Sequence, residues 1–164
     1  MVERSPASLQ PLLEQVGAAS RLGPGGTSLT VVESTLAAGL MPPLHAHEAE
    51  EAFYVLEGSL VVYAGAETVQ LDAGESFVAP GSVPHTHRAA TERARWLSMT
   101  FASSAGRYED FVRAVGAPAA DGGPALAVQD AAALLAFAAP IGIEVLGPPG
   151  MLPAELAPSA DRAA

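Results

Sequence analysis

Two His-x-His segments contain the residues of this chain that are best suited to chemistry. They hold all four histidines of the 164 residues, namely His45 and His47 in the first segment and His85 and His87 in the second. Glu51 follows four positions after the first segment. Imidazole nitrogens and a carboxylate oxygen form a donor set that binds divalent transition metals. The sequence therefore predicts a metal site before any other kind of site.

The spacing of these residues indicates that they share a face. Side chains alternate between the two sides of an extended chain. His45, His47 and Glu51 have one parity, so they could point to the same side, whereas Glu48 and Glu50 would point away. The same rule places both histidines of the second segment on one face. Two strands that face each other across a barrel interior would bring the segments together.

The first segment resembles the first motif of the cupin superfamily. That motif consists of Gly, five residues, His-x-His, three residues, Glu, six residues and Gly. All of its fixed positions are matched, by Gly39, His45, His47, Glu51 and Gly58.

The second segment resembles the second cupin motif less completely. That motif reads Gly, five residues, Pro-x-Gly-x-x-His, three residues and Asn, and Gly74, Pro80 and His85 occupy their places in it. Ser82 stands where the motif has Gly, and Ala89 stands where it has Asn. Neither departure removes a histidine.

The resemblance implies a fold and a set of metal ligands. The fold is all-β, a double-stranded β-helix or jelly-roll barrel, with short C-terminal helices packed on it. The ligands implied are His45, His47, Glu51 and His85, which would hold one divalent transition metal per chain. Imidazole and carboxylate accept Fe, Mn, Co, Ni, Cu or Zn, so the ligands leave the metal open.

A narrower resemblance lies in the C-terminal half. Residues 108–116 and 142–150 are similar to the tail of single-domain bacterial cupins that are grouped with the quercetin 2,3-dioxygenases. This likeness, which covers roughly residues 28–150, implies a metal-dependent dioxygenase that acts on a small enolic or phenolic, flavonol-like compound.

Three classes of function remain open at this point. In the dioxygenase, Glu51 would be both a metal ligand and the acceptor of a substrate proton. The second class is a redox-neutral cyclase or isomerase that acts on an aromatic or polyketide-like precursor. The third class is a small-molecule-binding protein without turnover. In each case Phe53, Val55, His87 and Trp96 are the candidates for the pocket wall.

The composition limits the partners. Without cysteine, neither disulfides nor thiolate ligands can form. Eight basic residues, all Arg, stand against 18 acidic ones and give a formal net charge of -10, which repels nucleic acids and anionic membranes. A small neutral substrate, with O2 for an oxygenase, is the expected partner. A signal-peptide pattern and a membrane-spanning apolar run are both missing, so we expect a cytoplasmic location.

A chain of this length suits one domain with four parts. We expect an N-terminal extension over 1–27, the barrel core over 28–102, a helical extension over 103–150 and a mobile tail over 151–164. Turn residues divide the core into predicted strands at 30–36, 52–57, 59–64, 74–78, 85–89 and 95–101. Helical spacing predicts helices at 5–17, 108–115 and 130–140.

The predicted strand 52–57 carries a further expectation. Tyr54 and Leu56 are large side chains on the face opposite Phe53 and Val55. An antiparallel strand with one wet face would have polar residues there. We therefore expect both faces of this strand to be covered, and we predict a homodimer. The strand would also form a hairpin with 59–64 around Gly58.

Overall fold

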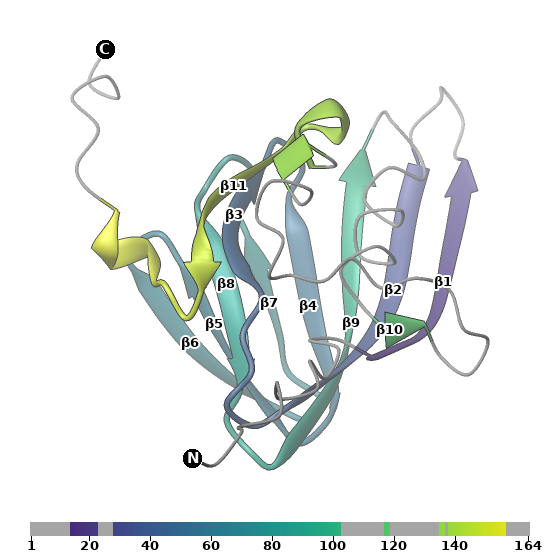
Figure 1. The fold of residues 1–164 in the computed structure, drawn as a ribbon. Helices are drawn as coiled ribbons and strands as arrows, with labels where there is room; N and C mark the ends of the chain where they lie inside the picture. Colours follow the sequence, from purple (N-terminus) through teal and green to yellow (C-terminus); the bar gives the residue numbers. More distant parts are fainter. Residues whose placement is uncertain (1–13, 23–27, 103–116, 119–134, 137, 157–164) are drawn as a thin grey trace, which may run out of the picture.

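The structure is a computed structural model that describes residues 14–22, 28–102, 117–118, 135–136 and 138–156. Figure 1 shows two sheets that face each other. In the six-stranded sheet the order is β10-β1-β2-β9-β4-β7, with bounds Ala117–Pro118, Glu14–Leu22, Ser28–Ala37, Arg93–Ala102, Glu51–Glu57 and Ser76–Ala79. In the five-stranded sheet the order is β11-β3-β8-β5-β6, with bounds Ile143–Pro149, Pro43–His47, His85–Ala89, Ser59–Ala64 and Glu67–Asp72.

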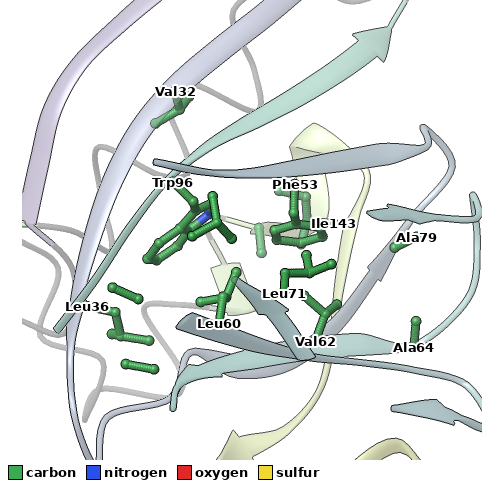
Figure 2. Packing of buried hydrophobic residues seen from close by; sticks show 14 residues of the cluster. Val32, Leu36, Phe53, Leu60, Val62, Ala64, Leu71, Ala79, Trp96 and Ile143 are labelled. Carbon is green, nitrogen blue, oxygen red and sulfur yellow. The ribbon is translucent and has the colours of Figure 1, made fainter. Parts of the chain in front are cut away.

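The hydrophobic core fills the space between the two sheets. Along β4 the side chains of Glu51, Phe53 and Val55 are buried while Tyr54 is exposed, which is the alternation that a strand with one inner face must show. Figure 2 shows the cluster of buried hydrophobic side chains, which come from both sheets. Its larger members are Val32, Leu36, Phe53, Val55, Leu60, Val62, Leu71, Trp96 and Ile143. The predicted all-β fold is therefore confirmed.

The prediction of a hairpin around Gly58 is wrong. Strands β4 and β5 belong to different sheets, so the chain crosses from one sheet to the other at this glycine. Gly58 has a φ of 70°, and a Cβ at this position would collide with the carbonyl oxygen of Arg93. Only glycine permits this close crossing. The chain does form a hairpin at the next turn, since Ala64 pairs with Glu67 in the antiparallel β5–β6 pair.

The N-terminal helix prediction is wrong where the structure tests it. Residues 14–17, the end of the predicted helix, lie in strand β1, and residues 5–13 lie outside the described residues. Strand β1 pairs antiparallel with β2 over most of its length. The hydrogen bonds of this pairing override a weak local helical pattern.

The C-terminal helices need a similar correction. The helix predicted at 108–115 lies outside the described residues, as does most of the helix predicted at 130–140. In the part of the C-terminal region that is described, residues 135–136 and 138 are helical, which agrees with the helix predicted at 130–140, and two 3-10 turns follow, η1 (Ala139–Ile141) and η2 (Pro153–Glu155). Residues 143–149, predicted to lie in a helical extension, form strand β11 because they pair with β3. No helix in the described ranges is long and apolar enough to cross a membrane.

Candidate metal centre

Four buried side chains meet at one end of the space between the sheets. They are His45 and His47 on β3, His85 on β8 and Glu51 at the start of β4. Each offers one nitrogen or oxygen atom, and these four atoms lie within 4.8 Å of one another. The side chains are between 1% and 7% exposed. The structure thus brings together the four residues that the cupin motifs indicate.

The route by which they meet differs from the prediction. The two histidine segments do not face each other across the interior, because β3 and β8 are neighbours in one sheet and His45 lies directly opposite His85. It is Glu51 that reaches across, from the six-stranded sheet. The chain changes sheets between His47 and Glu51. The intervening Glu48 and Glu50 are exposed, as parity predicted.

Each histidine of the centre is fixed by a backbone carbonyl. The Nδ1 atoms of His45, His47 and His85 lie 2.9, 2.8 and 2.8 Å from the carbonyl oxygens of Pro43, Ala49 and Val83. A carbonyl oxygen only accepts, so each Nδ1 carries the donated hydrogen. In the neutral ring this tautomer leaves the lone pair on Nε2, which is the arrangement that metal-binding histidines require.

The carboxylate of Glu51 contacts two of the three histidine rings in the cluster. Its Oε2 atom lies 3.2 Å from Nε2 of His47 and 3.2 Å from Nε2 of His85. If both rings are neutral, nitrogen lone pairs face a carboxylate oxygen at this distance, and the contact is repulsive. A cation between these atoms, either a proton or a metal ion, makes the contact favourable. The donor set and its geometry therefore fit one divalent metal ion.

Burial and the contacts within the cluster shift the pKa values of His45, Glu51 and His85. Burial, and then repulsion from His85, lowers the pKa of His45 to about 3, so this ring is neutral. Burial alone would raise the pKa of Glu51, but the contacts with His47 and His85 hold it well below its ordinary value. Burial alone would lower the pKa of His85, and the contact with Glu51 raises it instead.

The loop before His85 shows how the chain accommodates the departures from the second motif. Ser82, at the position of the motif glycine, has a φ of 61° and is the only non-glycine residue with positive φ in the described part. Its backbone N–H donates to the carbonyl oxygen of His47 over 2.7 Å. A Cβ on Gly81 would collide with the carbonyl oxygen of Glu48. Ala89, at the position of the motif asparagine, is buried in the hydrophobic core.

The predicted wall residues are buried, as the four-residue cluster is. Phe53, Val55 and Trp96 are at most 1% exposed, and His87 is 6% exposed. The His87 ring makes edge contacts with Phe53 and Trp96, with centroids 5.4 and 4.9 Å apart. Burial lowers the pKa of His87 to about 4, so the ring is neutral. Their role as a pocket wall stays a prediction.

Thr100 belongs with this group, and sequence reasoning missed it. It lies directly opposite Glu51 in the β4–β9 pair and is 1% exposed. Ser98 is also buried and accepts a hydrogen bond from the Trp96 indole over 3.0 Å. Parity along β9 could have found both, because an inward Trp96 places the second and fourth residues after it on the same face.

Comparison with known proteins agrees with this fold. Residues 32–100 match the family model for the Cupin domain, a range that includes all four residues of the cluster. The two facing sheets are thus those of an all-β cupin fold. Among curated proteins, none matches the chain.

Several solved structures are similar to parts of the chain. One is a variant of salicylate 1,2-dioxygenase from Pseudoaminobacter salicylatoxidans, with 27% identity over 58% of this chain and 28% of that chain and a TM-score of 0.45. Another is the DMSP lyase DddQ from Ruegeria pomeroyi DSS-3, with 25% identity over 52% and 46% and a TM-score of 0.42. A third is an RmlC-like cupin from Shewanella frigidimarina NCIMB 400, with 22% identity over 65% and 96% and a TM-score of 0.45. The match spans less than half the length of the dioxygenase and of the lyase.

Proposed function

We propose that this protein is a metal-dependent dioxygenase that acts on a small enolic or phenolic compound, as in the quercetinase-like group. The observation that carries the proposal is the contact of Glu51 with two imidazole lone pairs in a buried cluster of three histidines and one carboxylate. A divalent transition metal bound there would supply Lewis acidity and, if redox-active, electrons for O2 chemistry. One metal per chain, held by His45, His47, Glu51 and His85, is part of the proposal.

Glu51 is the residue that we assign to proton transfer. Its Oε2 atom lies 3.2 Å from Nε2 of His47 and 3.2 Å from Nε2 of His85, at the meeting point of the cluster. An enol or phenol binds a metal best as its anion, so its proton must move to a nearby base. Of the four cluster residues, Glu51 is the one that comes from the six-stranded sheet, beside the wall residue Phe53. It can therefore receive this proton on the substrate side of the centre.

Oxygen consumption tests the proposed reaction. Protein purified without a His tag and loaded with Fe, Mn, Co, Ni or Cu is screened against flavonols and small enols in an oxygen electrode. We expect O2 uptake with at least one metal and no conversion under strict anaerobiosis. Conversion at an unchanged rate without O2 would overturn the dioxygenase and favour the redox-neutral cyclase or isomerase. Tight binding without any conversion would favour a binding protein.

The variant Glu51→Gln tests the proton acceptor. The amide oxygen can still coordinate, but the amide cannot take the proton. We expect part of the metal to be retained and turnover to fall by about 100-fold or more, which is the usual contribution of a general base. Asp72→Asn, which neutralises an exposed carboxylate on β6, is the control and should behave like the parent.

We also propose that the protein is a homodimer. The outer face of the six-stranded sheet carries Tyr54 and Val78, which are 38% and 50% exposed. Leu97 pairs with Tyr54, and Met99 pairs with Ala52, on the same outer face. A second copy would cover this apolar surface. Sedimentation at micromolar concentration that shows only the chain mass of 16.6 kDa would exclude the dimer.

A further inference from the structure

Two buried polar side chains near the metal centre have no hydrogen-bond partner among the described residues. Both ring nitrogens of His87 and the hydroxyl oxygen of Thr100 are in this position. The side chains are 6% and 1% exposed. A polar group that is removed from water and left without a partner destabilises the fold, and buried polar groups therefore nearly always have one. These two groups thus call for partners that the described residues do not provide.

Their positions define two levels in the interior. Thr100 is the cross-strand neighbour of Glu51, so its hydroxyl lies at the level of the metal centre. His87 lies two residues after His85 on β8, and residues at this spacing share a face and lie about 7 Å apart. Along the direction of β8, His87 therefore lies about two residues beyond the level of Thr100 and the metal centre.

The side chains around His87 indicate what kind of ligand could be its hydrogen-bond partner. Phe53 lies two residues after Glu51 on the facing strand, and its ring contacts the His87 ring. Trp96 contacts the same ring from β9, while its own N–H is already donated to Ser98. Of His87, Phe53 and Trp96, His87 is therefore the residue with a ring nitrogen that can still bond to a ligand. Its ring lies against two aromatic rings. Such a setting suits a planar ring with a polar group at its far end.

We propose that His87 and Thr100 are specificity-determining residues for a bifunctional planar ligand. One oxygen of the ligand would lie at the metal centre, where the Thr100 hydroxyl bonds to it. A second oxygen, para to the first on a single ring, would bond to His87. This inference rests on the proposed function only in taking the centre to bind a phenolic oxygen. It excludes ligands whose far end is apolar.

A matched pair of phenols tests the proposal. Hydroquinone and 4-methylphenol have the same ring and nearly the same size, and they differ in the para group, which is hydroxyl in one and methyl in the other. Both are titrated under nitrogen into Co²⁺-loaded protein, and the visible absorption of the cobalt reports binding. The parent should bind hydroquinone about tenfold more tightly than 4-methylphenol, because the methyl group leaves His87 without a partner.

Three variants separate the two residues. His87→Phe should lose the preference for hydroquinone, and His87→Gln, which keeps a donor and an acceptor, should retain part of it. Thr100→Val should weaken both phenols alike, because its effect lies at the shared end. Cobalt content is measured for each variant and should stay close to that of the parent.

Each outcome of these titrations supports or overturns the proposed role of His87. Equal preference in the parent and in both His87 variants overturns the proposal and assigns His87 to the core. A His87→Phe variant that does not fold transfers the decision to His87→Gln, in which loss of all preference at full cobalt content also overturns it. If neither phenol changes the cobalt spectrum of the parent, the proposed phenolic substrate fails together with this inference. A clear preference without any O2 uptake supports the inference and overturns only the oxygenase.

Discussion

The two sheets contribute to the centre in different ways. The five-stranded sheet supplies three histidines, and a backbone carbonyl of the same chain segment fixes each ring. The six-stranded sheet supplies one carboxylate, and its next inward residues, Phe53 and Val55, belong to the hydrophobic core. One sheet therefore supplies the nitrogen donors of the cluster. The other determines the charge of the centre and the surface beside it.

This division has an energetic consequence. The inward histidines of β3 contribute little to the apolar cluster, in which the larger side chains come mainly from β2, β4, β5 and β9. Loss of a histidine should therefore affect metal binding more than folding. Loss of an inward aromatic residue from β4 or β9 should affect folding first. Substitutions in each sheet can test this separation.

The largest effect is expected from the histidines of β3. The double variant His45→Ala, His47→Ala should fall from about one metal ion per chain to a small fraction of that, because two of four ligands are gone. His87→Ala is the control and should keep the parent stoichiometry. Metal analysis of dialysed protein measures both. Equal metal content in the parent and the double variant would exclude the assigned ligands.

A comparable substitution in the six-stranded sheet should act on stability. Phe53 is fully buried, so Phe53→Ala should lower the free energy of unfolding by about 3–5 kcal/mol. Gln70→Ala on β6 truncates an exposed side chain outside the proposed dimer surface, and its effect should stay within about 0.5 kcal/mol. Urea denaturation of metal-free protein measures both. Similar losses for the two variants would contradict the inward placement of Phe53.

Strand β11 joins the C-terminal region to the metal-binding sheet. Ile143 lies opposite His47, is 4% exposed and belongs to the hydrophobic core. Ile143→Ala should lower the free energy of unfolding by about 2–4 kcal/mol. Because the lost packing lies beside a ligand, metal affinity should fall as well. Glu144→Ala changes the adjacent exposed residue and serves as the control. Unchanged metal affinity in Ile143→Ala would mean that β11 does not support the ligand strand.

The strands of the core could be predicted because their signals are local. The apolar residues of 52–57 indicate a strand, and the parity of Glu51, Phe53 and Val55 gives its inner face; the structure agrees with both. Strand β1 was missed because its residues carry a local helical pattern, and pairing with the next strand, β2, overrides that pattern. Strand β11 was missed because Pro148 and Pro149 argue against a strand, although an edge strand such as this one tolerates proline.

The four residues of the cluster could be predicted, but their arrangement could not. Motif spacing identifies four donors, and parity correctly separates His47 and Glu51 from the two glutamates between them. Parity does not say which strands are neighbours. The prediction placed the two histidine segments on facing strands, whereas they lie on adjacent strands of one sheet. Parity with Trp96 could have placed Thr100 on the inner face of its strand, but a threonine in a strand is ordinary and does not by itself indicate a site. Only the pairing of β4 with β9 brings it to Glu51.

The smallest effect is expected at the departure from the second motif. Ser82 has a φ of 61°, which costs a residue with a side chain about 1–2 kcal/mol, and glycine avoids this strain. The glycine variant also has a free energy of unfolding that is lower by about 0.4–1 kcal/mol, because glycine gives the unfolded chain more conformational freedom. Ser82→Gly should therefore raise the free energy of unfolding by about 1 kcal/mol or less.

The neighbouring glycine sharpens this last test. Gly81 contacts the backbone of Glu48, and a Cβ there would force the loop away from the segment that holds His47. Gly81→Ala should therefore destabilise the protein and weaken metal binding, whereas Ser82→Gly should leave metal binding intact, because the N–H of residue 82 still donates to the His47 carbonyl. Thermal denaturation with and without Zn²⁺ measures both variants. If Ser82→Gly destabilises the protein, the serine side chain itself supports the loop, and the departure from the motif is an adaptation of this chain.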